Sequence, residues 1–303
     1  MHAIVYFKAL ADATRLRILN LLMRRELNVN EIVTLLGMSQ SRISRHLKIL
    51  TDCGLLKYRR DGLWSFYSSG KDGPGAELLS ILSDYLFSDT ELSADYERLS
   101  SVIEEGYRQK AGFFDSLAPE WDEIKYAILG DFNVSGAIAE RIRRCDVAAD
   151  LGCGTGELLP YIKQKAKKVI GVDKSPKMLE LAQRRLNLNG IELRIGELEH
   201  LPMRDNETDA AVINMVLHYL LSPDAAILEA ARVVKSGGSL VIVDLDKHQN
   251  EQMREKYGHR WLGFKRKNIE HWLSEAGFML AEFAQFDALN DLKIDLYMSE
   301  KRK

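Results

Sequence analysis

Three glycines at alternate positions, Gly152, Gly154 and Gly156, have a spacing that points directly to ligand chemistry. Glycine has no Cβ, so such a loop can turn sharply and bring its main-chain amides close to a ligand. Asp173 ends the next apolar segment, and a carboxylate there can accept hydrogen bonds from ribose hydroxyls. The glycines and Asp173 together predict a nucleoside pocket.

Alternating strands and helices must position this loop. Residues 147–151 read as a buried strand before the glycines, and a helix is expected to begin near Glu157. Helices are predicted before the loop at 113–124 and 136–142, and after it at 175–190, 222–235 and 268–278. Strands are predicted at 168–173, 191–197, 208–216, 237–246 and 291–299. This alternation predicts a doubly wound α/β fold with a mainly parallel sheet. Ligands in such sheets lie at the carboxyl ends of the strands, where Asp150, the glycine loop, Asp173, Glu197 and Asn214 fall.

A different pattern occupies the first seventy residues. Helices are predicted at 10–26 and at Val29–Leu36, the second ended by Gly37. A third helix is expected after an N-cap at Ser39, with Ile43, Leu47 and Leu50 on its buried face. No acid occurs from residue 39 to 51. Its other faces carry side chains suited to the DNA major groove: Gln40, Ser41, Arg42, Ser44, Arg45, His46 and Lys48.

A basic hairpin is predicted next, around Asp61-Gly62. A hairpin behind a helix-turn-helix is a wing, and Arg59 and Arg60 are expected to contact phosphate. The alternative is a surface helix that merely happens to be basic. The charge balance favours DNA: residues 1–70 hold 11 Lys and Arg against 5 Asp and Glu, a net charge of +6, whereas the remainder holds 31 against 39, a net charge of −8.

We expect three segments: a DNA-binding domain at 1–70, a helical connector at 71–110 and a ligand-binding domain at 111–303. The connector carries an apolar stripe of Leu78, Leu82, Tyr85 and Leu86, which either packs on the first domain or forms a dimer seam. Three scattered cysteines (Cys53, Cys145, Cys153) indicate a reducing cytoplasm, with no disulfide framework and no metal site. No apolar run approaches the roughly 20 residues of a membrane span.

Residues 4–69 resemble the winged-helix repressors of the ArsR/SmtB type, through FKALADATRLRILNLL and SQSRISRHLKILTDCGLLKYRRDGLWSFYS. The resemblance implies a homodimer on an inverted repeat of double-stranded DNA, with Gln40, Ser41, Ser44 and His46 facing bases. Metal-sensing members carry two cysteines where this chain has Asn28 and Asn30. Asparagine is a poor ligand for soft metals, so the departure implies a different signal.

Residues 111–303 resemble class I S-adenosylmethionine (SAM) methyltransferases, and among them the ubiquinone/menaquinone biosynthesis type. A dinucleotide loop has the spacing Gly-x-Gly-x-x-Gly, whereas DLGCGTGE has its third glycine one residue earlier and is similar to motif I of these enzymes. VDKSPKMLELA, GELEHLP and INMVLHYL are similar to their later motifs. The resemblance implies a Rossmann-like fold that binds SAM or S-adenosylhomocysteine (SAH).

By that likeness Asp173 would hold the ribose, Glu197 and the Leu198 amide the adenine, and Met178 the nucleoside face. Gly152 and the Asn214 carbonyl would approach the methionyl end. The full expected ligand-binding set is Asp150, Gly152, Cys153, Gly154, Gly156, Asp173, Lys174, Met178, Glu197, Leu198 and Asn214. Cys153 is better explained by the spacing of the loop than by chemistry. Phe113, Phe114 and Trp121 form either a lid over the ligand or helix core.

Catalysis is the open question. A base is needed only if a methyl acceptor must lose a proton, and His218 and His248 are the candidates, with a surface or hydrogen-bonding role as the alternative for each. The segment after Asn214 lacks the motif of enzymes that methylate nucleic-acid amines. The fusion resembles SAH-responsive repressors of methionine-cycle genes. The first hypothesis is therefore a DNA-binding regulator that senses SAM or SAH; the alternative is an active small-molecule methyltransferase with an appended DNA-binding domain. A third hypothesis gives the winged domain only a scaffolding role.

Overall fold

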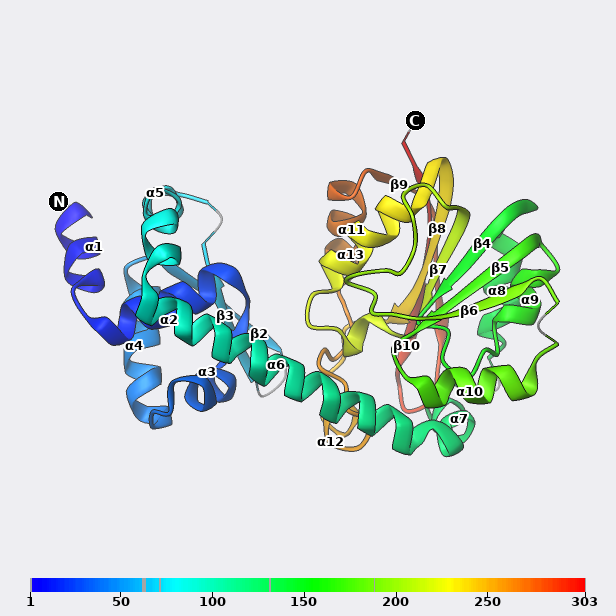
Figure 1. Ribbon diagram of the computed structural model, residues 1–303, viewed down its shortest axis with the longest axis horizontal. Coiled ribbons are helices and arrows are strands. Elements are labelled where there is room, and N and C mark those ends of the chain that lie inside the picture. Colours follow the sequence, from blue (N-terminus) through cyan, green and yellow to red (C-terminus); the bar gives the residue numbers. More distant parts are fainter. Residues whose placement is uncertain (1, 62–63, 71, 131, 188, 303) are drawn as a thin grey trace. The chain divides into compact units, whose positions relative to one another are not determined.

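The chain forms two compact units, Met1–Gln109 and Lys110–Lys303, in the computed structural model (Figure 1). The structure describes residues 2–61, 64–70, 72–130, 132–187 and 189–302, and within these ranges the side chains of 4–99 and 114–302. Each unit has its own hydrophobic core.

The first unit is a helical domain with a small three-stranded sheet. Its antiparallel strands follow the order β1-β3-β2. Its elements are α1 (His2–Leu10), α2 (Ala13–Arg24), β1 (Leu27–Asn28), α3 (Val29–Leu36), α4 (Gln40–Asp52), β2 (Leu56–Asp61), β3 (Trp64–Ser69), α5 (Pro74–Ser88) and the start of α6 (Thr90–Leu117). The predicted winged helix-turn-helix architecture is confirmed.

Local chemistry explains where these helices begin and end. Asp12 caps α2 by accepting a hydrogen bond from the Arg15 amide at 3.0 Å. Asn28 and Glu31 form a reciprocal capping box at the start of α3, and Gly37 ends that helix with a φ of 63°. Ser39 precedes α4 as predicted, but its side chain makes no capping hydrogen bond.

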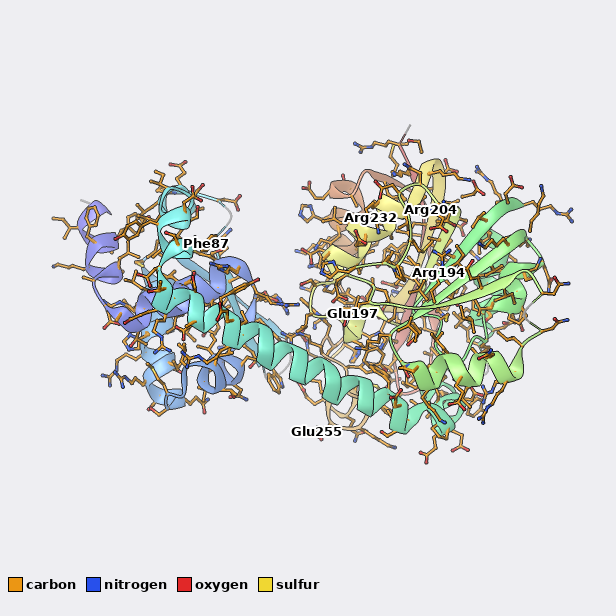
Figure 2. The ribbon with its side chains drawn as sticks, in the orientation of Figure 1. Phe87, Arg194, Glu197, Arg204, Arg232 and Glu255 are labelled. Atoms are coloured by element: carbon orange, nitrogen blue, oxygen red, sulfur yellow. The ribbon has the colours of Figure 1, made fainter. Side chains whose placement is uncertain are left out.

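One detail of the hairpin in the first unit differs from prediction. The hairpin strands pair Asp61 with Trp64, so Asp61 is a buried strand residue and not part of the turn; Gly62 lies outside the described residues. The apolar stripe of α5 is only partly covered, because Leu86 is buried whereas Tyr85 is 75% exposed. Figure 2 marks Phe87 on this helix, with the Arg24 guanidinium 4.0 Å from its ring centroid.

Helix α6 runs beyond the helical connector predicted at 71–110, because it continues through Gln109 to Leu117. Its N-terminal part is fixed in the first unit by Asp95, a buried carboxylate bonded to Arg17 at 2.5 and 2.7 Å. Asn20 also donates a hydrogen bond to the Leu92 carbonyl at 2.8 Å. The helix predicted at 113–124 is therefore wrong as a single element: α6 ends, a 3-10 turn (Ala118–Glu120) containing Pro119 follows, and α7 begins at Trp121.

The second unit is built on a seven-stranded sheet of order β6-β5-β4-β7-β8-β10-β9, parallel except for β10, which is antiparallel to both of its neighbours. Its strands are β4 (Cys145–Leu151), β5 (Ala166–Asp173), β6 (Ile191–Ile195), β7 (Thr208–Asn214), β8 (Val234–Leu245), β9 (Phe278–Asp287) and β10 (Lys293–Lys301). Its helices are α7 (Trp121–Leu129), α8 (Val134–Arg141), α9 (Leu159–Lys163), α10 (Pro176–Arg185), α11 (Pro223–Val233), α12 (Gln252–Tyr257) and α13 (Arg266–Glu275). The doubly wound α/β class is confirmed.

Helices cover both faces of this sheet and give it two apolar cores. One core holds Ile227 of α11 and Leu273 of α13, and the other holds Ile138 of α8 and Ile162 of α9 (Figure 1). Strand β9 was not predicted, because its partly exposed edge position breaks the apolar pattern. The helix after the glycine loop was also misplaced: residues 157 and 158 are turns and α9 starts at Leu159.

Candidate ligand site and DNA-binding surface

The glycine loop leaves the end of β4 in a conformation that favours glycine. Gly152, Gly154 and Gly156 have φ values of 86°, 52° and 81°. The Gly152 and Cys153 amides donate to the Val172 carbonyl at 2.7 and 2.9 Å, which ties the loop to β5. A Cβ at Gly156 would lie 2.8 Å from Leu186 Cδ1, so this glycine also permits the loop to pack on the end of α10.

Asp173 is held in a fixed orientation beside this loop. One carboxylate oxygen accepts the Gly154 amide at 2.8 Å and the other accepts the Ser175 amide at 2.9 Å. Burial raises the pKa of Asp173, and the two amides oppose that rise. A carboxylate oxygen can accept more than one hydrogen bond, so the side chain keeps capacity for ribose hydroxyls.

Three buried side-chain oxygens at the carboxyl ends of the strands have no hydrogen-bond partner among the described residues: Asp150 Oδ1, Thr155 Oγ1 and Asn214 Oδ1. Asp150 and Asn214 lie on the adjacent parallel strands β4 and β7, where Leu151 pairs with Ile213. Buried polar atoms normally have partners, so orphan acceptors indicate a site for a donor-bearing ligand. The ammonium of a methionyl group brings three donors, so these residues fit SAM or SAH.

The same strand ends carry electrostatic and backbone strain. Burial, together with the charge of Asp173, raises the pKa of Asp150 to about 7. Met215, directly after Asn214, has a φ of 53°, an unfavourable value for a residue with a side chain. Such strain is concentrated at functional sites.

The residues expected around the adenine follow β5 and β6. Met178 and Leu198 are buried, and Glu197, labelled in Figure 2, is half-buried in the loop after β6. Burial lowers the pKa of Lys174, whose ammonium lies 5.2 Å from the Phe114 ring centroid. Cys153 is buried with its thiol pKa raised by desolvation, which supports a packing role for this side chain.

An aromatic group that we call the ring cluster (Phe114, Trp121, Tyr219) lies beside the loop. Phe114 is 4.9 Å from Tyr219 and 5.9 Å from Trp121 between ring centroids. Trp121 Nε1 lies 3.6 Å from the position of a Cβ on Gly154. The ring cluster therefore spans the glycine loop and the segment after β7, as a lid requires; the Phe113 side chain lies outside the described residues.

A buried histidine pair follows β7. His218 is 1% exposed, and its Nδ1 lies 2.6 Å from Asp244 Oδ1 at the end of β8. Its ring stacks on His259 at 4.0 Å. His259 is 3% exposed, and both of its ring nitrogens lack partners among the described residues.

Burial and the neighbouring His218 lower the pKa of His259, which keeps its ring neutral. The two predicted bases have different partners: His218 pairs with the Asp244 carboxylate, whereas His248 interacts with a main-chain amide. His248 Nδ1 accepts the Asn250 amide at 3.2 Å. Asp244 and His259 were not predicted as site residues. His259 lies in the segment HRWLGF (residues 259–264), and only the fold brings that segment to the turn after β7.

The third helix of the first unit, α4, presents a polar face. Ile43, Leu47 and Leu50 are buried, as predicted from their spacing. The exposed face carries Gln40, Ser41, Arg42, Ser44, Arg45 and Lys48. This helix therefore offers hydrogen-bond donors without a competing acid on the same face.

Two of the residues predicted to contact DNA have partners within the unit. His46 turns inward: its side chain is largely buried, with Nδ1 3.9 Å from Asp12 Oδ1. Arg59 is already paired, since it donates to Glu26 at 2.7 Å and to Asp61 at 3.2 Å, so its guanidinium is committed within the unit. Arg60 remains exposed on the same strand.

A winged helix with a basic exposed helix, followed by an α/β unit with a nucleoside-type loop, defines a two-domain DNA-binding protein with a methyltransferase fold. Residues 12–58 match the family of the bacterial regulatory protein arsR, and residues 149–242 match a methyltransferase domain. The chain is 41% identical over 90 residues to a probable mercury resistance operon repressor of Streptomyces lividans, which covers 30% of this chain and 70% of that protein. The chain belongs to the arsR family and carries a methyltransferase domain after its DNA-binding domain.

The second unit has relatives of its own. It is 32% identical over 151 residues to a demethylmenaquinone methyltransferase of Lactiplantibacillus plantarum, which covers 44% of this chain and 61% of that protein. The chain spans only 30% of an uncharacterized Streptomyces fradiae relative that is 39% identical over 103 residues. A putative methyltransferase solved in complex with the Haloferax volcanii Trm112 activator shares the fold, with a TM-score of 0.54, 18% identity, and coverage of 63% of this chain and 98% of that one.

The described residues hold neither a metal-binding cluster nor a membrane-spanning helix. No group of three His, Cys, Asp or Glu residues there is arranged to hold a metal ion. No helix within the same ranges is long and apolar enough to cross a membrane.

Proposed function

We propose that this chain is a DNA-binding transcriptional regulator whose second unit binds SAM or SAH as its effector. The observation that supports the proposal is a set of polar groups at the strand ends: Asp173 is fixed on the glycine loop, and Asp150, Thr155 and Asn214 each have a buried side-chain oxygen without a partner among the described residues. A chain that joins such a pocket to an exposed, acid-free helix has the two sites that an effector-controlled repressor needs.

Helix α6 is the element we assign to communication between these sites. In the first unit it is anchored by Asp95 to Arg17. In the second unit Asp115, close to its C-terminal end, accepts a hydrogen bond from Ser175 Oγ at 2.5 Å, and Ser175 also caps α10. A ligand that binds between Asp173 and the ring cluster therefore acts on the end of a helix rooted in the other unit. The ligand changes DNA affinity only by its differential affinity for the two helix arrangements.

A homodimer on an inverted repeat completes the proposal. Exposed apolar side chains occur on α1, at Val5 and Phe7, and on α5, at Ile81 and Tyr85, with exposed fractions between 50% and 78%. A second copy of the chain would cover these side chains, and dimers of helix-turn-helix units read paired half-sites. We place this activity in the cytoplasm, where DNA is available and the three cysteines, all free, stay reduced.

The test is fluorescence anisotropy of the full chain on a labelled fragment of its own promoter, with SAM, SAH or neither. We expect one ligand to shift the DNA affinity at concentrations that saturate the pocket. Asp173→Ala should abolish the shift while leaving ligand-free DNA binding intact. Equal DNA affinity with and without saturating ligand would contradict the effector role.

A second function, methyl transfer to a small molecule, is favoured by one specific observation. The Asp244–His218 pair is buried next to the proposed donor site, and its 2.6 Å bond is the arrangement that orients a histidine base. The test is an assay for transfer of the labelled methyl group of SAM to small molecules in a cell extract. If the chain binds SAM but yields no labelled product, this function is excluded.

A further inference from the structure

We propose that His218, oriented by Asp244, accepts the proton of an aromatic hydroxyl group as that oxygen takes a methyl group. The inference rests on the proposed binding of SAM in the second unit and goes beyond it, because it assigns an acceptor site and an acceptor class. The residues that would contact the acceptor are those of the ring cluster, His218 and His259.

The hydrogen bond to Asp244 decides which nitrogen of His218 is the base. Asp244 Oδ1 also accepts the Leu245 amide at 2.8 Å, which holds the carboxylate in place. When this carboxylate is ionised, His218 Nδ1 must donate, so the lone pair of the neutral ring lies on Nε2. The described residues give Nε2 no hydrogen-bond partner.

The segment 259–264 holds the second histidine against this base. The His218 carbonyl accepts the amides of Arg260 and Trp261 at 2.9 and 3.0 Å. Trp261 Nε1 donates to the Leu220 carbonyl at 2.8 Å, which fixes the segment on the turn after β7. His259, neutral and without a partner on either nitrogen among the described residues, is then placed to hydrogen-bond the acceptor oxygen.

Ring contacts connect His218 to the glycine loop, where we propose that SAM binds. Tyr219 contacts His218 at 4.2 Å and Phe114 at 4.9 Å between ring centroids, and Trp121 of the same ring cluster lies against Gly154. A continuous row of rings therefore runs from the glycine loop to His218. Burial raises the pKa of Tyr219, with the Asp244 charge as a second cause, so this phenol stays neutral and serves as a wall.

These walls select the acceptor class. Flat ring faces suit a planar aromatic compound. The nearest fixed charge to His218 is the Asp244 carboxylate, which disfavours an anionic acceptor. A neutral amine attacks with its own lone pair, whereas a neutral hydroxyl becomes a good nucleophile only as it loses its proton. A buried histidine base is therefore matched to an aromatic hydroxyl.

The step balances with SAM as the only co-reactant. The acceptor O–H bond breaks and its proton passes to His218 Nε2. The oxygen electron pair forms the new O–CH₃ bond as the S–CH₃ bond breaks, and that bonding pair stays on sulfur, which leaves SAH. The imidazolium formed is stabilised by Asp244 and releases its proton to water after the product leaves. The titratable groups near the histidine pair are Asp244, Tyr219, His248, Arg254 and Tyr257.

One readout needs neither a substrate nor a variant in the site. In ¹⁵N-histidine-labelled full chain saturated with SAH at alkaline pH, neutral His218 should be the Nδ1–H tautomer with an unprotonated Nε2. An Nε2–H tautomer would overturn the proposal, because the lone pair would then face Asp244.

The second readout is transfer from methyl-labelled SAM to catechol and 2-naphthol, with aniline as the amine comparison. His218→Asn should lower the rate by about 100-fold or more while the calorimetric affinity for SAH stays the same. Asp244→Asn should lower the rate and shift its pH profile, and Asp244→Glu should recover part of the loss. His271→Asn, an exposed histidine on α13, is the matched control and should keep the wild-type rate.

The outcomes separate the two proposals. If SAM and SAH do not bind, the ligand pocket itself is wrong. If they bind but neither hydroxylated probe is methylated, or if His218→Asn transfers at the wild-type rate, the acceptor site is overturned and the effector role stands.

Discussion

The protonation of Asp150 gives the sharpest quantitative prediction for the ligand site. Its carboxylate is 2% exposed, one oxygen has no partner among the described residues, and the neighbouring Asp173 carboxylate adds a like charge. Because burial and that charge raise its pKa to about 7, the folded protein pays a desolvation cost to keep Asp150 ionised. Replacing Asp150 with Asn removes that cost.

The sign and size follow from linkage. The pKa in the folded chain is about 7, whereas the unfolded chain has a value of about 3.9. A raised carboxyl pKa gives a stabilising contribution that is fully present below pH 4 and is lost as the pH rises to 7. Three units of pKa at 1.36 kcal/mol each give about 4 kcal/mol as the upper size of this loss. Asp150→Asn should therefore leave stability nearly unchanged at pH 4 and raise it, by up to that amount, at pH 8.

The assay is denaturant unfolding of the full chain at pH 4, 6 and 8, followed by tryptophan fluorescence. Trp121, Trp261 and Trp272 report on the second unit, and Trp64→Phe removes the signal of the first unit. The difference in unfolding free energy between the wild type and the variant isolates the contribution of Asp150, because both proteins share all other carboxyl groups. If the difference in unfolding free energy between variant and wild type is the same at pH 4 and pH 8, the pKa of Asp150 is not raised in the folded chain.

Three further sets of substitutions test the packing of the glycine loop, the roles of two arginines in the first unit and the exposed face of α5. Gly156→Ala, at a φ of 81° with 2.8 Å to Leu186 Cδ1, should cost about 1–3 kcal/mol in a melt of the second unit and weaken SAH binding; wild-type stability would argue against the close packing. Arg45→Ala should weaken DNA binding by about 1–3 kcal/mol in anisotropy without loss of stability. Arg59→Ala should instead lower the melting temperature, because Glu26 loses its partner; the reverse pattern would contradict the different roles given to these two arginines. Aspartate at both Ile81 and Tyr85 should shift sedimentation toward monomer with unchanged helical circular dichroism, and an intact dimer would remove α5 from the interface.

Much of the architecture follows from local chemistry that sequence alone displays. The capping pattern at Asn28 and the glycine at 37 define α3 to the residue, and the spacing of Ile43, Leu47 and Leu50 predicts the buried face of α4. The glycine loop was found for the same reason, since three positive-φ positions leave a signature in residue type. Features set by neighbouring residues in sequence are predictable.

Features that depend on residues far apart in the sequence were not predictable in this way. Arg59 and His46 were assigned to DNA because residue type cannot show that Glu26 and Asp12 approach them. The partnership of His218 with Asp244, 26 residues away, depends on the order β7-β8 in the sheet. Strand β9 was missed because an edge strand is selected by its pairing with β10 and not by its own polarity.

The central claim is that one chain couples a SAM or SAH pocket to DNA. Coupling of two binding sites is reciprocal, so DNA must change the ligand affinity by the same factor by which the ligand changes the DNA affinity. The most direct measurement is calorimetric binding of SAH and of SAM to the full chain, alone and saturated with its promoter fragment, beside the anisotropy titration. We expect equal factors in the two experiments, at least about fivefold for one ligand, and no change of either affinity in Asp173→Ala. The same ligand affinity with and without DNA, for both SAM and SAH, would contradict it.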